Sequence, residues 1–303
     1  MKSLSLAGIP RTMSQLALGT SSLETQAQAD PILDAFHAAG GTLFDTAHHY
    51  GDGRADRVLG AWMAKRGLTD AVTVIGKGAH TPFCHPSHVT PQLDASLAAL
   101  QRDCIDMYFL HRDDLAIPVG EWVDVLDGHV RAGRIRRYGG SNWTPARIDA
   151  ANAYAASHGK TGFTALSNQF SLADMIAPPW PGCLAASDAE SLAWLRRTGT
   201  PLFAWSSQAR GFFTDRAISA TPADPELVRC WHNPTNLARR ARAQDLARQR
   251  GTTVAGLALA YNLAQDFPLF PIIGPLTMDE LHSSLDVLKV ALTPAEVTWL
   301  RDG

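Results

Sequence analysis

A carboxylate, two histidines and a tyrosine lie close together just after a short run of residues that reads as a strand. Residues 42–44 follow a glycine pair, the sequence turns polar at Asp45, and Tyr50 lies five residues further on. This pattern predicts a short buried strand that ends at Asp45. Sites in parallel barrels and open α/β sheets form at the carboxyl ends of strands, so this stretch is the first candidate for acid–base chemistry. The alternative is that Asp45 caps the next helix and Tyr50 packs.

Two further strand ends carry groups that complement Asp45 and Tyr50. The apolar run 72–75 leads into Lys77, and a second run, 105–110, ends at His111. An ammonium at the end of a buried strand needs a partner, and Asp45 is the candidate counter-ion. Each of these residues alone is more often a solvated side chain. Four convergent proton-active groups together predict a catalytic site.

Eight runs have the length and apolar character of buried strands. They cover residues 14–18, 42–45, 72–77, 105–110, 135–141, 165–169, 202–205 and 269–273. Amphipathic helices are predicted between them, with starts marked by a capping residue and proline at Asp30-Pro31, Thr90-Pro91, Thr144-Pro145 and Thr293-Pro294. Eight strand–helix units in sequence favour an α/β fold of the (β/α)8 TIM-barrel class, as a single domain over residues 1–303. A doubly wound open sheet is the alternative, but no GxGxxG motif follows the first strand.

The composition excludes several classes of partner. The chain is 46% hydrophobic and 18% charged with a net charge of -2, which argues for a soluble globular protein and against nucleic acid as a partner. No apolar run approaches the roughly 20 residues of a membrane span. The four cysteines form no CxxC pair and no signal segment opens the chain, so we expect a cytoplasmic protein with free thiols. The sequence assigns no oligomeric state.

Two connections are longer than plain strand-to-helix loops. They cover residues 171–187 and 213–236 and contain several prolines and tryptophans. Long ordered loops in a compact domain are usually functional, and both are expected to follow strand carboxyl ends. We therefore predict that they lie over the C-terminal face of the barrel as walls or lids of a pocket.

Eight short motifs follow one another along the chain. They are LGT (18–20), FDTAHHYG (44–51), VIGK (74–77), IDMYFLHR (105–112), GSN (140–142), NQ (168–169), AWSSQARG (204–211) and IIG (272–274). In this order they resemble the aldo-keto reductase family over nearly the whole chain. The resemblance implies an NAD(P)H-dependent carbonyl reductase whose catalytic residues are Asp45, Tyr50, Lys77 and His111.

The chemistry of these four side chains agrees with that assignment. A free tyrosine has a pKa near about 10, and an adjacent ammonium such as Lys77 is expected to lower it. Asp45 would compensate the burial of Lys77. His111 would orient and polarise the substrate carbonyl while Tyr50 supplies the proton.

Hydride must come from a nicotinamide cofactor, because no side chain can donate it. The resemblance assigns cofactor contacts to residues at the strand ends and the loops that follow them. They are Gly19, Thr20, Ser21, Asp45, Ser141, Asn142, Gln169, Trp205, Ser206, Ser207, Gln208, Arg210, Gly274, Leu276, Thr277, Glu280 and Ser284. Trp205 stands where the family usually has tyrosine and would stack on the nicotinamide ring.

The adenosine end of the assigned cofactor site departs from the family pattern. Many members carry arginine at the position of Leu276, glutamine at that of Glu280 and asparagine at that of Ser284. The arginine clamps the 2'-phosphate of NADPH, and a leucine cannot do so. NADPH is expected on family precedent, with NADH as the alternative. The basic run Arg239, Arg240 and Arg242 would reach the phosphate instead or form a solvated helix face.

The substrate pocket is expected to be mostly aromatic, which suits an apolar or sugar-ring face beside a reducible carbonyl. Its predicted lining is His49, Phe83, Arg112, Trp143 and Phe170.

Two other functions compete with a reductase. His80, Cys84, His85 and His88 could suggest zinc and a metal-dependent barrel hydrolase, but two prolines interrupt the run and no carboxylate accompanies it, so no metal is expected. The second is a cofactor-binding regulatory subunit similar to the potassium-channel β-subunits, which share the fold. Turnover of simple aldehydes separates an enzyme from such a sensor.

Overall fold

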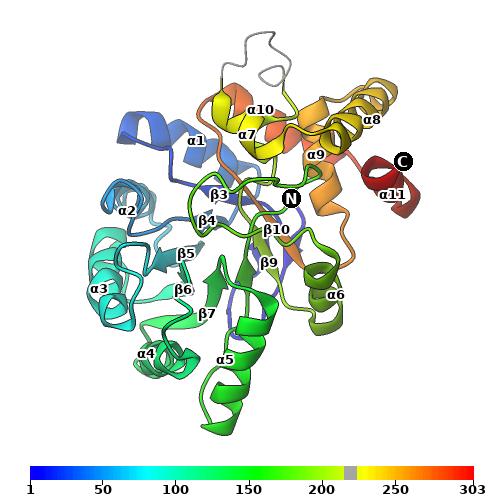
Figure 1. Ribbon diagram of the computed structural model, residues 1–303. Coiled ribbons are helices and arrows are strands. Elements are labelled where there is room, and N and C mark those ends of the chain that lie inside the picture. The colour runs from blue at the N-terminus through cyan, green and yellow to red at the C-terminus, as the bar shows by residue number, and fades with distance from the viewer. Residues whose placement is uncertain (215–223) are drawn as a thin grey trace. The chain divides into compact units, whose positions relative to one another are not determined.

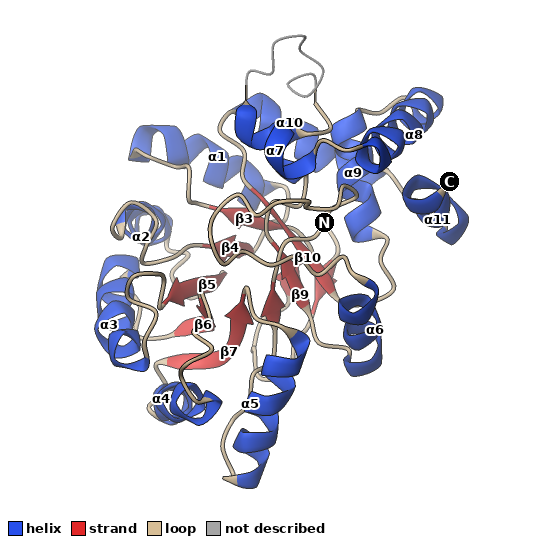
Figure 2. Cartoon of the chain, in the orientation of Figure 1, coloured by secondary structure: helices blue, strands red, loops and turns tan. Residues whose placement is uncertain are grey.

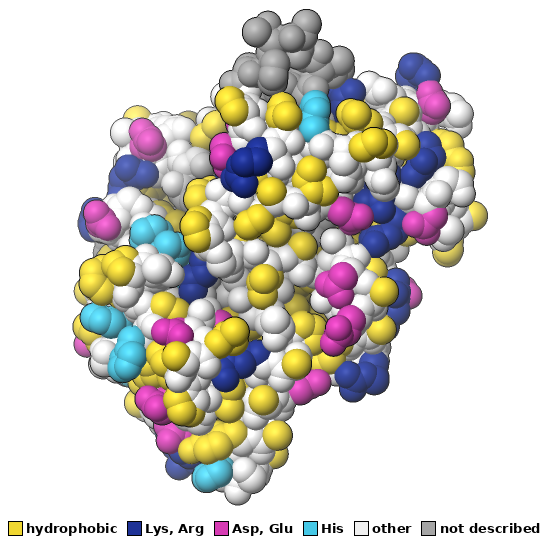
Figure 3. Space-filling view, viewed as in Figure 1, with side chains coloured by type: hydrophobic (Ala, Val, Ile, Leu, Met, Phe, Trp, Pro, Cys, Tyr) yellow, Lys and Arg dark blue, Asp and Glu magenta, His cyan; other side chains and the backbone are white. Residues whose placement is uncertain are grey.

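The computed structural model describes residues 1–214 and 224–303 of the chain. By the density of internal contacts the chain divides into two compact units, Met1–Ser167 and Asn168–Gly303. Single-domain organisation therefore stays a prediction. On the face shown in Figure 3, acidic and basic side chains are interspersed, in keeping with the small net charge. Within the described ranges, no helix has the length and apolar character needed to cross a membrane.

The parallel strands form a closed eight-stranded barrel, in the order β10-β3-β4-β5-β6-β7-β8-β9 (Figure 1). Helices flank the strands, as Figure 2 shows, so the predicted (β/α)8 TIM barrel is confirmed. A two-stranded antiparallel sheet precedes the barrel, with Ser3 opposite Ser14.

The first unit carries six of the barrel strands and five α-helices. Its elements are β1 (Ser3–Leu4), β2 (Met13–Ser14), β3 (Ala17–Gly19), α1 (Gln26–Ala38), β4 (Leu43–Asp45), α2 (Arg54–Arg66), β5 (Thr73–Gly78), the 3-10 helix η1 (Pro86–His88), α3 (Val89–Leu100), β6 (Ile105–Leu110), α4 (Val119–Arg131), β7 (Ile135–Ser141), α5 (Pro145–Ser157) and β8 (Leu166–Ser167). The predicted strand 14–18 is thus two strands. Ser14 Oγ donates to the carbonyl of Leu16 and accepts from the Thr42 N–H, which ties the junction to the start of β4.

The described part of the second unit contains two barrel strands among mostly helical segments. Its elements are α6 (Ala189–Thr198), β9 (Leu202–Ala204), the 3-10 helix η2 (Ala209–Gly211), α7 (Pro225–Trp231), α8 (Pro234–Arg250), α9 (Val254–Leu263), β10 (Leu269–Ile273), α10 (Met278–Asp286), the 3-10 helix η4 (Val287–Lys289) and α11 (Pro294–Asp302).

The two predicted long loops have different outcomes. Residues 171–187 carry no helix, and a single β-bridge joins Gln169 to Ala185 beside them. The predicted loop 213–236 is wrong in part, because α7 and the start of α8 lie within it, and residues 215–223 lie outside the described ranges. Asp224 caps α7 and Asn233 caps α8, each followed by proline, which explains both helix starts.

Two of the four predicted helix starts are correct. Thr144 caps α5, and Thr293 caps α11 with the predicted capping box. The other two are wrong. Thr25 caps α1 before the predicted start at Asp30, so Pro31 lies inside the helix. Thr90 lies inside α3, and its hydroxyl contacts a ring nitrogen of His129 instead of a helix N–H.

Candidate functional site

The register of three neighbouring strands brings Asp45, Lys77 and His111 to one face. Asp45 on β4 pairs with Ile75 on β5, and Lys77 pairs with Phe109 on β6. Side chains two residues apart on a strand share a face. Lys77 therefore lies on the same face as Ile75 and Asp45, and His111 follows Phe109 on that face. All of these residues belong to the first unit.

Lys77 is the centre of the group. Its ammonium donates to Asp45 Oδ1, to the Thr46 carbonyl at 3.2 Å and to Tyr50 Oη at 3.4 Å. An ammonium has three hydrogens, so each has one acceptor. Lys77 and Asp45 are each only 3% exposed. The predicted ion pair and the predicted approach of Lys77 to Tyr50 are both present.

Burial, and not the ammonium, dominates the ionisation of Tyr50. Loss of solvation raises the pKa of Tyr50 above its ordinary value, and the nearby Asp45 charge raises it further. Lys77 opposes both effects but does not outweigh them. The expectation that Lys77 brings this pKa below 10 is therefore wrong for the free protein. Burial also raises the pKa of Asp45, while its partners raise that of Lys77 against the effect of burial.

His111 is a neutral imidazole at physiological pH. Burial lowers its pKa well below 6.5, and the positive charges of Lys77 and Arg112 act in the same direction. Its ring meets the ring of Tyr50 edge-on, with the centroids 5.6 Å apart. His111 Nδ1 is buried without a hydrogen-bond partner among the described residues. A neutral imidazole with an unused ring nitrogen can bind an incoming polar group.

The lowered pKa of His111 predicts that the folded protein loses stability in acid. The unfolded chain binds a proton at this residue near about pH 6.5, whereas the folded protein resists it until well below. The free energy of unfolding should therefore fall as the pH drops below about 6.5, by up to roughly 1.4 kcal/mol per pH unit from this group. Urea unfolding between about pH 5 and pH 8 should show a shallower loss for His111→Gln. An equal change of the free energy of unfolding with pH in the wild type and in His111→Gln would contradict this prediction.

Of the predicted substrate residues, His49 and Phe83 are exposed, whereas Arg112, Trp143 and Phe170 are buried. His49 is exposed and stacks on His80 with 3.8 Å between ring centroids, and Phe83 is 53% exposed. Arg112 is buried and donates to the carbonyl of His111. His80 also meets His111, at 4.8 Å, so it belongs to this group although the sequence suggested it only as a metal ligand.

Trp143 and Phe170 do not fit the predicted pocket lining. Trp143 is fully buried, packs against Phe163 and donates from its indole nitrogen to the Arg112 carbonyl. Phe170, in the second unit, is fully buried against Tyr261. Neither ring offers surface to a substrate. Both are aromatic residues just beyond strand ends, and their packing into the interior could not be told from the sequence pattern.

Two residues beside Lys77 were missed. Thr46 accepts from Lys77 through its carbonyl, and its hydroxyl donates to the buried carboxylate of Asp56 at 2.5 Å. The sequence did contain a signal for Asp56. It lies three positions before Leu59 and seven before Met63, which places it on the apolar face of α2. A carboxylate on such a face needs a specific partner.

The possible zinc ligands are engaged elsewhere. His85 accepts from the N–H of Ser87 at the start of η1, and the His80 ring nitrogen lies 2.6 Å from the carbonyl of Thr81. Over residues 1–214 and 224–303 no group of three or more histidine, cysteine or acidic side chains could hold a metal ion. Burial raises the pKa of Cys84 to about 12, which disfavours its thiolate.

The predicted cofactor residues of the first unit lie at strand ends. Gly19 ends β3, and the Thr20 hydroxyl and N–H both donate to the carbonyl of Asp45, while Ser21 is exposed. Ser141 ends β7. Asn142 follows with a φ of 59°, and its amide donates to the His111 carbonyl.

The second unit carries the segment 205–210, which has unusual backbone conformations. Ser206, Ala209 and Arg210 have φ values of 48°, 48° and 53°, a region that non-glycine residues rarely adopt. Such conformations cluster at ligand sites. Ser207 Oγ donates to the carbonyl of Ile272, and Gln208 reaches the carbonyl of Ala255.

Aromatic and amide groups accompany this segment. The Arg210 guanidinium lies over the Trp180 ring at 4.9 Å, and Trp180 lies 6.4 Å from Trp205. Gln169 is fully buried, and its Oε1 has no hydrogen-bond partner among the described residues. A buried acceptor without a partner is costly, and a donor on a ligand would satisfy it.

An acidic side chain occupies the predicted adenosine end. Thr277 caps α10, and the Glu280 carboxylate accepts from the N–H of Leu276 at 2.7 Å. Leu276 itself is exposed, Ser284 is buried, and a Cβ at Gly274 would meet open space. The carboxylate would repel a phosphate placed beside Leu276.

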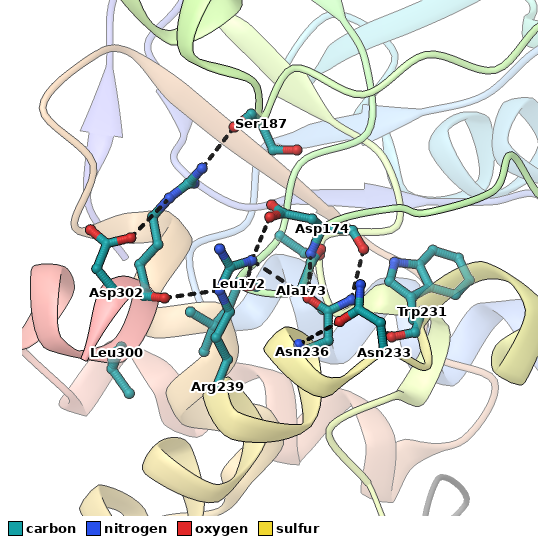
Figure 4. A network of polar contacts seen from close by, with 12 residues as sticks. Leu172, Ala173, Asp174, Ser187, Trp231, Asn233, Asn236, Arg239, Leu300 and Asp302 are labelled. Carbon is teal, nitrogen blue, oxygen red and sulfur yellow. Dashed lines mark hydrogen bonds and ion pairs between the residues drawn. The ribbon is translucent and has the colours of Figure 1, made fainter.

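Three of the arginines of α8, Arg239, Arg240 and Arg242, bind carbonyl groups of neighbouring segments of the second unit. Arg239 pairs with Asp174 at 2.7 Å and donates to the carbonyls of Leu172 and Arg301 (Figure 4). Asn236 joins the same network through Asp174. Arg239 therefore ties the segment 171–187 and the C-terminal helix to α8.

Arg240 and Arg242 also donate hydrogen bonds to backbone carbonyls. Arg240 donates to the carbonyls of Phe212 and Thr214, and Arg242 donates to that of Leu300. Arg239 and Arg240 are buried, so the run is not a solvated face. Backbone carbonyls accept several of the N–H groups of these guanidinium groups, which leaves fewer donors for a 2'-phosphate.

Comparison with known proteins agrees with the architecture. A sequence model described as "Aldo/keto reductase family" matches residues 15–302. Aldo-keto reductase ausK of Aspergillus calidoustus is 28% identical, covering 89% of this chain and 70% of its own. Norsolorinic acid reductase stcV of Emericella nidulans is 28% identical, over 98% of this chain and 79% of its own length. Aryl-alcohol dehydrogenase [NADP(+)] of Phanerodontia chrysosporium is 26% identical, over 89% of this chain and 74% of its own length.

Proposed function

Because this chain belongs to the aldo/keto reductase family and is an oxidoreductase, we propose that it reduces an aldehyde or ketone to the alcohol with a nicotinamide cofactor. One observation carries the proposal: the three hydrogens of the buried Lys77 ammonium are directed at Asp45, the Thr46 carbonyl and Tyr50 Oη. This arrangement couples one phenol to one fixed positive charge beside a neutral imidazole.

The four side chains have distinct roles in this proposal. Tyr50 donates the proton to the carbonyl oxygen, and its raised pKa keeps it in the acid form at neutral pH. Lys77 stabilises the phenolate that forms as the proton leaves. Asp45 fixes Lys77. His111, being neutral, donates a hydrogen bond to the carbonyl oxygen and orients it.

The residues present fit a nicotinamide cofactor, which supplies the hydride when bound. The buried, unpartnered Oε1 of Gln169 supports a contact with the carboxamide, as proposed also for Ser141 and Asn142. The aromatic face of Trp205 suits a nicotinamide ring. For the phosphates we propose the segment 206–210 with Arg210, and for the adenosine end the segment from Gly274 to Ser284.

We propose aromatic carbonyl compounds as the substrate class. Relatives of this chain are named as an aryl-alcohol dehydrogenase and as a reductase of norsolorinic acid. The stacked rings of His49 and His80 offer flat faces beside His111, and the exposed Phe83 lies three residues after His80 in the chain. Arg112 remains a proposed neighbour of the substrate, whereas Trp143 and Phe170 are withdrawn because they are fully buried.

A carbonyl panel tests the proposal. Benzaldehydes, aryl ketones and aliphatic aldehydes of similar size would each be mixed with the protein and either NADPH or NADH, and oxidation of the cofactor followed by absorbance. We expect the aryl aldehydes to have the highest kcat/KM. Cofactor binding without turnover of any carbonyl compound would instead favour a regulatory subunit.

Discrimination between NADPH and NADH should be weak. Without an arginine at Leu276, and with Glu280 beside it, a bound 2'-phosphate forfeits roughly 1.5 to 3 kcal/mol of charge-assisted contact. Leu276→Arg should tighten NADPH about ten- to a hundredfold and leave NADH nearly unchanged. Glu280→Gln should tighten NADPH up to about fivefold. Dissociation constants would be measured by tryptophan fluorescence.

Asp279→Asn is the matched control, since Asp279 lies in the same first turn of α10 and is exposed. It should change neither dissociation constant by more than about twofold. A wild-type preference for NADPH beyond about a thousandfold, or no response to Leu276→Arg, would show that another cation holds the phosphate, with Arg210 the first to test.

A further inference from the structure

A buried carboxylate stands behind the catalytic lysine and is linked to it through one residue. Asp56 on α2 is fully buried. Its Oδ1 accepts from the Thr46 hydroxyl at 2.5 Å, and its Oδ2 accepts from the Ser96 hydroxyl at 2.7 Å. Ser96 lies on α3. The carboxylate therefore ties two helices to the residue that follows β4.

Thr46 is held from both sides. Its N–H donates to the carbonyl of Ile75 on β5 at 2.9 Å, and its hydroxyl is held by Asp56. Its carbonyl takes one hydrogen of the Lys77 ammonium at 3.2 Å. With Asp45 taking another, the direction of the third hydrogen toward Tyr50 is set by where Thr46 and Asp45 lie.

Charged groups surround both ends of this chain of contacts. Asp56 is in electrostatic reach of Lys77 and His48, and it also acts on the buried phenol of Tyr108. Tyr50 is faced by Lys77, Asp45 and Arg112, and by the neutral ring of His111. Burial raises the pKa of Asp56, while the hydroxyls of Thr46 and Ser96 lower it. Two donated O–H bonds suit a carboxylate that acts as a fixed acceptor.

We propose that Asp56 is a positioning residue of the reaction: acting through Thr46, and anchored by Ser96, it aims the third N–H of Lys77 at Tyr50. This inference rests on the proposed function, because it needs Tyr50 as the proton donor. Loss of the anchor lets the Thr46 carbonyl and the ammonium shift, and a displacement of about 1 Å in such a group can cost up to roughly a hundredfold in rate.

The test compares Thr46→Val, Thr46→Ser and Asp56→Asn with the wild type. Valine matches threonine in shape but cannot donate to Asp56, whereas serine can. In Thr46→Val and Asp56→Asn we expect kcat for carbonyl reduction to fall about tenfold or more, with the cofactor dissociation constant unchanged within about twofold. The basic limb of the kcat–pH profile should move up by about half a pH unit or more, since Tyr50 loses the directed ammonium. Thr46→Ser should have the kcat and the basic limb of the wild type.

Asp127→Asn provides a matched control. Asp127 on α4 is a buried carboxylate that pairs with Arg131 and accepts from the N–H of Thr161, so its loss perturbs the fold without touching Lys77. It should leave kcat and the pH profile as in the wild type. If Asp56→Asn fails to fold, Thr46→Val and Ser96→Ala carry the same comparison.

The outcomes separate this inference from the proposed function. Wild-type kcat and an unmoved basic limb in Thr46→Val would overturn the role of Asp56. So would a Thr46→Ser variant as defective as Thr46→Val. An active Tyr50→Phe variant would instead rule out Tyr50 as the proton donor, and absence of turnover by the wild type with any carbonyl compound would overturn the proposed function itself.

Discussion

Tyr50→Phe should lose carbonyl reduction by about a hundredfold or more in kcat, because the Tyr50 phenol, which contacts both Lys77 and His111, is the group proposed to supply the proton. The cofactor dissociation constant should stay within about threefold of the wild type, since the substitution removes one oxygen and keeps the ring. The measurement is kcat with a saturating aryl aldehyde, together with a fluorescence titration of the reduced cofactor.

Tyr154→Phe is the control for removal of a phenolic oxygen. Tyr154 lies on α5, and its hydroxyl contacts Asp124 at 3.3 Å, outside the Lys77 group. This variant should keep wild-type activity. A Tyr50→Phe protein that retains more than about a tenth of the wild-type kcat would rule out Tyr50 as the proton donor.

Lys77→Met and Asp45→Asn should each lower kcat, and the double variant should be little worse than Lys77→Met. The two side chains form one buried ion pair, and residues that act as a unit are strongly non-additive. Lys77→Met should cost about a hundredfold or more in kcat, because Tyr50 then lacks the ammonium that is hydrogen-bonded to its hydroxyl. It should also lower the free energy of unfolding by roughly 3 to 5 kcal/mol, because Asp45 is left buried and unpaired. The double variant should recover part of that loss.

The exposed pair Lys160 and Asp124 is the matched control. It has the same charges, but its lysine and aspartate lie on the surface of the first unit. Lys160→Met and Asp124→Asn should leave kcat unchanged, and their coupling in unfolding by urea should stay within about 1 kcal/mol. Full additivity of the losses at Lys77 and Asp45 would show that the two do not act as a pair.

The sequence was enough to predict the barrel because its signals are local. Each strand is a short apolar run, and strand pairing in a barrel then follows from the order of the runs. Thr144 and Thr293 are correct helix caps because their hydroxyls accept the N–H groups of Arg147 and Glu296. Thr90 is not a cap, because a tertiary contact with His129 takes its hydroxyl and η1 runs directly into α3.

The sequence could not predict the burial of individual side chains or their contacts with residues far away in the chain. The spacing of strand ends predicted that Asp45, Lys77 and Tyr50 would meet, because parallel strands bring their carboxyl ends to one edge. It could not show that burial outweighs the ammonium at Tyr50, since solvation depends on the whole surroundings. Arg239 and Arg240 belong to a basic run in the sequence but are buried in the fold, where backbone carbonyls accept their hydrogens.

The central claim is that this chain transfers hydride to a carbonyl carbon with Tyr50 as the acid. The most direct measurement uses a reduced nicotinamide cofactor that carries deuterium at its hydride-donating position, an aryl aldehyde and the wild-type protein, with the alcohol analysed by mass spectrometry. The account predicts one deuterium on the former carbonyl carbon of the product and no alcohol with Tyr50→Phe over the same time. Alcohol without deuterium, or no alcohol from any aldehyde with either cofactor, would contradict it.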